Sequence, residues 1–126
     1  ALPIYLSIDY AKTRVTFGKP IAKLQAIQFM LADMEIRCQT ARSLVYECAR
    51  LVDSGTVNGK MNAIAKAYAS EAAMQNALDA VQILSGYGYS REYEAEKLMR
   101  DAKIFMIFEG TNQIQRVVIA GHLLKD

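Results

Sequence analysis

The chain has 126 residues, of which 52% are hydrophobic and 22% charged, the composition of one ordinary globular domain with a core of its own. Its formal net charge is only +2 and its basic residues are scattered, so neither a nucleic acid nor an anionic membrane is expected as a partner. No apolar run has the length of a membrane span, and residues 2–8 are too short and too poorly flanked for a signal peptide.

Residues 2–12 are predicted to form the end of a helix. No capping residue precedes them, and a helix without a start signal leads us to expect a chain cut from something longer. Residues 14–20 form a connector, because a glycine and a proline interrupt the helical pattern. From the residues alone, Arg14 is a surface arginine and Phe17 fastens the connector to the core.

The longest predicted helix runs from Ile21 to about Ser54. Apolar residues recur along it at alternating spacings of three and four, as in a continuous packing seam. The residues of this seam are Leu24, Ile27, Leu31, Met34, Cys38, Ala41, Val45, Cys48 and Val52. A helix of this length extends for about 50 Å, and so long a seam favours antiparallel partners in a bundle. Gln25 lies beside the seam, where a solvated position is the simplest interpretation.

The two cysteines fall within this helix. Cys38 and Cys48 are about 15 Å apart along a helix axis, which is too far for a disulfide. Unpaired thiols are typical of a reducing compartment. The cysteine spacing matches no metal-ligand pattern, and His122 is the sole histidine, so no metal site is expected.

A tight polar turn at residues 54–59 separates this helix from the next, with Gly55 suited to the position just after the helix end. The second helix runs to about Leu84 and is rich in alanine, which lets neighbouring helices approach closely but is also simply the best helix former. Residues 82–89 end it. Their glycines favour a helix cap and turn, and no strand precedes them as in a dinucleotide-binding fingerprint.

The last part of the chain holds two more predicted helices. Ser90 is expected to cap a short helix over residues 92–102, and a final helix covers residues 112–124. No strand of any length is predicted. The fold class is therefore all-α, an up-down arrangement like a four-helix bundle.

Glu109 lies between these two helices, directly after the apolar run 104–108. Gly110 breaks the chain direction, and Thr111 has the side chain to cap the last helix. A carboxylate in apolar surroundings has a raised pKa, the condition for a base near neutral pH. The alternative from the residues alone is a solvated loop glutamate.

Three segments resemble the acyl-CoA dehydrogenase family. Residues 100–104 with 108–116 (R-D-A-K-I and F-E-G-T-N-Q-I-Q-R) match its C-terminal signature. Residues 14–21, R-V-T-F-G-K-P-I, match its R-x-x-F-G-x-x-[IL] segment, with Gln25 downstream, and residues 82–89 match Q-[IVL]-x-G-G-x-G-[YF]. The resemblance implies that residues 1–126 form the C-terminal helical domain, without the family's N-terminal helical and middle β domains.

The resemblance also implies residue roles. Glu109 is implied as the catalytic base that removes the α proton of an acyl-CoA, with Phe108 and Gly110 beside the substrate. The cofactor is FAD, and the residues implied to contact it are Arg14, Thr16, Phe17, Gln25, Gln82, Ile83, Leu84, Ser85, Gly86, Thr111, Asn112 and Gln113. In the family the segments that correspond to residues 14–21 and 82–89 contact the flavin of a neighbouring subunit. Two positions depart from the family pattern, since Ser85 replaces its first glycine and Phe108 its usual tyrosine.

The implied activity is α,β-dehydrogenation of an acyl-CoA thioester, with the ending of the chain most similar to butyryl-CoA types. Implied partners are an electron-transfer flavoprotein, the missing domains, and further copies in a homodimer or homotetramer, in a bacterial cytoplasm or mitochondrial matrix. The isolated chain is expected to be inactive. Two alternatives stay open: a helical oligomerisation module without chemistry, and a related flavin oxidase.

Overall fold

The computed structural model describes residues 1–125, so residue 126 of the predicted domain lies outside the described residues. In chain order the elements are α1 (Leu2–Thr13), β1 (Val15–Thr16), β2 (Lys19–Pro20), the 3₁₀ turn η1 (Ile21–Lys23), α2 (Gln25–Asp53), α3 (Gly59–Leu84), α4 (Gly86–Tyr89), α5 (Ala95–Ile104) and α6 (Asn112–Leu123). The predicted all-α fold is confirmed. None of the helices described is long and apolar enough to cross a membrane.

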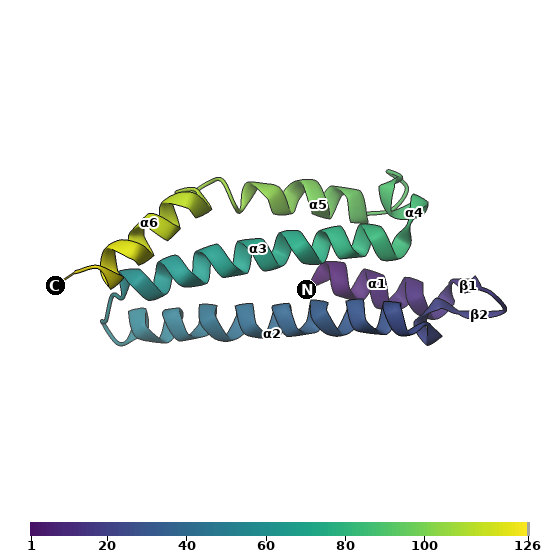
Figure 1. Cartoon of the computed structure of the whole chain (residues 1–126), viewed down its shortest axis with the longest axis horizontal. Helices are drawn as coiled ribbons and strands as arrows, with labels where there is room; N and C mark the ends of the chain where they lie inside the picture. The colour runs from purple at the N-terminus through teal and green to yellow at the C-terminus, as the bar shows by residue number, and fades with distance from the viewer. Residues whose placement is uncertain (126) are drawn as a thin grey trace.

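Helix α3 is the centre of the fold. The long helices α2 and α3 lie side by side and antiparallel, α1 packs against both toward one end, and α5 and α6 follow each other along α3 (Figure 1). Small side chains allow this close packing, because α3 buries the alanines Ala63, Ala65, Ala67, Ala72, Ala77 and Ala80. The arrangement is the expected bundle, with α3 in contact with all the other α-helices.

The start of the longest helix differs from the prediction. Helix α2 begins at Gln25 rather than Ile21, because Leu24 is extended (φ −87°, ψ 125°) and interrupts the helical backbone. The three residues before Leu24 form η1, in which Leu24 N–H donates to Ile21 O at 2.9 Å. Ile21 is thereby buried in the core between α1, α2 and α3. At the far end of α2 the seam emerges from the core, and Val52 is 53% exposed.

The turn between α2 and α3 confirms the role predicted for Gly55. This residue has φ +79°, its N–H donates to Val52 O at 2.9 Å, and Thr56 N–H donates to Leu51 O at 2.8 Å. These two bonds close the helix end in the Schellman pattern. Asn58 then caps α3, its side chain accepting from Met61 N–H at 3.0 Å.

Two further predictions need correction. Helix α5 covers Ala95–Ile104 rather than residues 92–102, since Ser90 Oγ accepts from Glu92 N–H at 3.3 Å and thus closes a separate turn before the helix. The connector also contains strands, which were not predicted: Val15 pairs with Pro20 and Thr16 with Lys19. Each strand has only two residues, too few for an alternating pattern to mark them in the sequence.

Candidate active site

The loop between α5 and α6 holds Glu109 in an unusual backbone conformation. Glu109 (φ +52°) and Gly110 (φ +81°) are both left-handed, and this pair breaks the helical path between α5 and α6. Thr111 then caps α6, its hydroxyl accepting from Ile114 N–H at 3.3 Å, so the roles predicted for Gly110 and Thr111 in the chain path are confirmed. A non-glycine residue in this region costs about 1–3 kcal/mol, and such strain is typical of functional sites.

Hydrogen bonds hold the loop in this conformation. Asn112 N–H donates to Met106 O at 3.0 Å and so closes the loop across its base. Lys66 of α3 reaches across and donates from Nζ to Gly110 O at 2.8 Å. Gln115 Nε2 lies 3.3 Å from the carbonyl oxygens of both Glu109 and Gly110. The N–H of Glu109 donates to no group within residues 1–125, which leaves it available to a ligand.

A cavity of about 410 Å³ opens beside Glu109. Its lining residues are Lys66, Ala69, Ser70, Ala73, Phe105, Phe108 and Glu109. The walls are mainly apolar, and the rings of Phe105 and Phe108 meet edge to face with centroids 5.3 Å apart. Phe108 thus lines the same cavity as Glu109. Glu109 itself is exposed, so the expected apolar enclosure of its carboxylate is not provided by the described residues.

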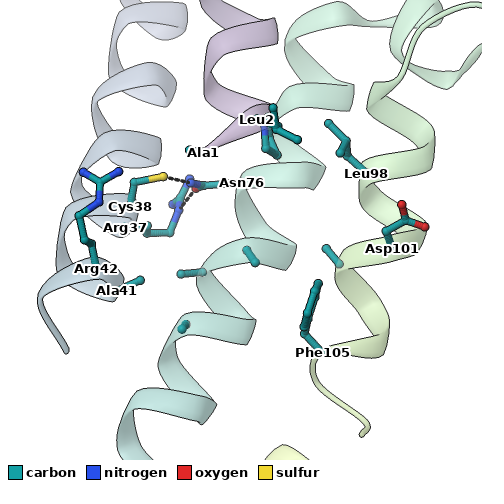
Figure 2. A pocket seen from close by; sticks show the side chains of 15 residues that line it. Ala1, Leu2, Arg37, Cys38, Ala41, Arg42, Asn76, Leu98, Asp101 and Phe105 are labelled. Carbon is teal, nitrogen blue, oxygen red and sulfur yellow. Dashed lines mark hydrogen bonds between the residues drawn. The ribbon is translucent and has the colours of Figure 1, made fainter. Parts of the chain in front are cut away.

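A second cavity, of about 390 Å³, adjoins the first and shares Ala69, Ala73 and Phe105 with it. Figure 2 shows Arg37 and Cys38 of α2 directed toward Asn76 of α3, with Phe105 entering from α5. Asn76 Oδ1 accepts from Arg37 Nε at 2.6 Å, while Asn76 Nδ2 donates to Cys38 Sγ at 3.2 Å. These polar groups satisfy one another, so the cavity beside Glu109 remains the better candidate for chemistry.

The other two segments that resemble the family, residues 14–21 and 82–89, meet at the opposite end of the bundle. The guanidinium of Arg14 lies over the ring of Tyr87, 5.6 Å from its centroid, and Tyr10 and Tyr93 complete an aromatic cluster. These four residues help to line a cavity of about 490 Å³. The fold thus brings together two segments that are more than sixty residues apart in the sequence.

The predicted cofactor residues at this end differ in accessibility. Arg14, Gln25 and Gln82 are exposed, and Thr16 is half-buried in β1. Phe17 is 88% exposed at the tip of the hairpin, so the expectation that it fastens the connector to the core is wrong. It also has φ +54°, a conformation that the hairpin turn imposes.

The following segment combines buried side chains with exposed backbone turns. Ile83 and Leu84 are buried in the core, so their side chains are unavailable to a cofactor and any contact from them must come from the main chain. Ser85 adopts φ +52° and ψ −134°, a conformation that favours glycine. Glycine is also the residue that the family pattern has at this position. Gly86 begins α4 directly after this turn.

The side chain of Asn112 is 1% exposed and engaged in hydrogen bonds, so a cofactor contact from this residue would have to come from the main chain. Its Nδ2 donates to Ser70 Oγ at 2.8 Å, and its Oδ1 accepts from Lys66 Nζ at 2.7 Å. Gln113 is exposed at the start of α6. Lys66 and Phe105 were missed as site residues. Lys66 could have been noticed as a charged residue flanked by alanines that α3 buries.

The two ends are well separated within one chain. Lys66, which is bonded to the Glu109 loop, and Gln82 both belong to α3 and are sixteen residues apart. At about 1.5 Å per residue this places the two surfaces about 24 Å apart along the helix.

Comparison with known proteins identifies the protein family. The family model described as acyl-CoA dehydrogenase, C-terminal domain, matches residues 3–124. The chain belongs to the acyl-CoA dehydrogenase family, and what it contains is the family's C-terminal domain. It superposes with a TM-score of 0.96 on butyryl-CoA dehydrogenase from Megasphaera elsdenii, at 47% identity over 98% of this chain and 32% of the other.

Two curated relatives are similarly close. An acyl-CoA dehydrogenase of Bacillus subtilis is 54% identical over 118 residues, 94% of this chain and 31% of the relative. A subunit of the caffeyl-CoA reductase–Etf complex of Acetobacterium woodii is 49% identical over 119 residues, again 94% of this chain and 31% of the relative. The chain therefore spans about a third of the length of the proteins it matches.

Proposed function

We propose that the chain is the C-terminal domain of an FAD-dependent acyl-CoA dehydrogenase and that Glu109 is its catalytic base. The observation that carries the proposal is the strained loop that presents Glu109 at the mouth of an apolar cavity. The residues before this domain would supply the family's N-terminal helical and middle β domains. They would also cover Glu109, which is exposed here.

In the proposed reaction the carboxylate of Glu109 takes the proton from the α carbon of an acyl-CoA. The electron pair of the broken C–H bond forms the new α,β double bond, while a hydride leaves the β carbon. Bound FAD supplies the hydride acceptor. As the thioester oxygen becomes enolate-like, the unengaged N–H of Glu109 would donate to it. Gly110 adds no side chain to obstruct the approach, and the Phe105–Phe108 pair borders the acyl group.

The residues at the Arg14 end fit an FAD. Arg14 has a planar guanidinium suited to a pyrophosphate, and the exposed Gln82 offers amide donors and acceptors. Phe17 presents an exposed ring that its own chain does not cover. Gln25, Thr16 and the backbone at Ser85 would complete this surface. Thr111 and Gln113 would contribute at the α6 end, where backbone N–H groups favour an anion.

The separation of about 24 Å between the two ends supports a cofactor shared by two copies of the chain. In this proposal the Arg14 surface of one subunit serves the flavin that lies beside Glu109 of another. Large apolar side chains exposed along α2, including Phe29, Ile36 and Tyr46, suit burial in a homodimer or homotetramer.

The substrate and the electron acceptor are proposed from the relatives. Similarity to butyryl-CoA dehydrogenase favours a short-chain acyl-CoA, and similarity to a subunit of an Etf-containing complex favours an electron-transfer flavoprotein as acceptor. A bacterial cytoplasm or the mitochondrial matrix is the proposed compartment. A non-catalytic oligomerisation module is the second candidate, favoured by the exposed Glu109 and the exposed apolar residues of α2.

The test compares the purified chain with the same chain joined to the upstream domains. Each is mixed with FAD, freed of excess cofactor, and then given butyryl-CoA without oxygen while the flavin absorbance is followed. The proposal predicts that the joined protein binds FAD and bleaches, while the chain alone does neither. If the joined protein binds no flavin, the module is the better description. If it bleaches and then reoxidises rapidly in air, it is a flavin oxidase.

A further inference from the structure

Lys66 connects the centre of the bundle to the loop that carries Glu109. Its ammonium donates to Gly110 O at 2.8 Å and to Asn112 Oδ1 at 2.7 Å, although these partners are more than forty residues away in sequence. We propose that Lys66 is a positioning residue, which acts by holding the loop so that Glu109 faces the substrate. The inference rests on the proposed function, since it assigns a role in that reaction.

The loop requires such support. The left-handed conformations of Glu109 and Gly110 turn the Gly110 carbonyl away from any helical partner, so its hydrogen bonds must come from side chains. Gln115, half-buried like Lys66, provides one contact at 3.3 Å. Lys66 is closer and charged, and hydrogen bonds from a charged donor are about twice as strong as neutral ones.

The second acceptor of Lys66 is itself rigid. Asn112 is buried, and its amide nitrogen donates to Ser70 Oγ at 2.8 Å and to Ala67 O at 3.3 Å. The ammonium thus joins Asn112, which is held between α3 and α6, to the Gly110 carbonyl next to Glu109. Because Lys66 and Glu109 line the same cavity, a small movement of the loop would change the distance from the carboxylate to the α carbon.

The test uses Lys66→Met in the complete flavin-loaded enzyme, with Lys60→Met as the matched control. Lys60 lies on the same helix, and its side chain makes no hydrogen bond or ion pair among the described residues. We expect Lys66→Met to lower kcat by about 10- to 100-fold, with KM and FAD content within about twofold of wild type. Lys66→Arg, which keeps the charge and several donors, should restore most of the lost kcat. Lys60→Met should leave kcat unchanged.

A second readout does not depend on activity. Hydrogen exchange at Asn112 N–H, which donates to Met106 O across the loop, should accelerate about tenfold in Lys66→Met but not in Lys60→Met. Unchanged exchange together with unchanged kcat would overturn the inference. A parallel loss of FAD and thermal stability would also overturn it, since Lys66 would then be only structural. An inactive wild-type enzyme would refute the proposed function instead, and the exchange result would still decide whether Lys66 holds the loop.

Discussion

Ser85 occupies a backbone conformation that favours glycine, and replacing it with glycine should stabilise the protein. Its φ of +52° with ψ of −134° brings the side chain of any residue but glycine into conflict with the backbone. Ser85 is exposed, and its hydroxyl makes no hydrogen bond to another residue among those described, so Ser85→Gly removes strain without removing a contact. The turn between α3 and α4 would keep its shape.

The expected gain follows from two opposing terms. A non-glycine residue in this region costs about 1–3 kcal/mol. Glycine loses more conformational freedom on folding, at a cost of about 0.5–1 kcal/mol. The difference is a stabilisation of about 1 kcal/mol, which for a domain of this size raises Tm by about 4 °C.

Urea-induced unfolding and thermal melting of wild type and variant measure this difference. Ser54→Gly is the matched control, because Ser54 has an ordinary φ of −80° and donates from Oγ to Leu51 O at 2.8 Å. We expect the control to be neutral or slightly destabilised. If Ser85→Gly were also neutral or destabilised, the left-handed serine would not be a source of strain and the reasoning would be refuted.

Three further substitutions test the packing and the charges. Gly88→Ala should cost at least about 2 kcal/mol in unfolding experiments, because the added Cβ would lie 2.6 Å from Val81 O; an unchanged midpoint would contradict this close approach. Asn112→Ala should cost about 1–3 kcal/mol and lower Tm, since it leaves buried polar partners unsatisfied; a neutral result would show that water replaces the amide. The hydrogen bond from Arg100 lowers the pKa of the Glu96 carboxyl. The stability that this bond adds is therefore present above pH 4.5, the ordinary pKa of a glutamate. The difference in unfolding free energy between wild type and Arg100→Gln should shrink as the pH falls below that value.

The elements that the sequence predicts well are those specified by neighbouring residues. Gly55 ends α2 and Thr111 caps α6 as expected, because these signals depend on conformational freedom and on a side chain beside its own helix end. The start of α2 is shifted by four residues since the burial of Ile21 and the extended Leu24 depend on contacts with other helices. Tertiary packing overrides the local helical pattern there.

The candidate site shows the same division. Glu109, Gly110 and Phe108 lie together because they are adjacent in sequence, and the motif locates them directly. Lys66 enters the site from another helix, and although its charge stands between alanines, no spacing in the sequence connects it with Glu109. The burial of Asn112 depends on its contacts with α3, which the motif does not reveal. The resemblance implies a cofactor contact for this residue, whereas in the structure its side chain is buried and hydrogen-bonded within the domain.

The most direct test of the account is the anaerobic reaction of the flavin-loaded enzyme carrying Glu109→Gln with butyryl-CoA, followed by flavin absorbance. Glu92→Gln, at an exposed glutamate on the turn before α5, is the control. We expect Glu109→Gln to bind FAD normally but to reduce it about 10²- to 10⁴-fold more slowly, the usual contribution of a positioned base. Reduction at the wild-type rate would show that another group removes the proton, and the central assignment of Glu109 would be wrong.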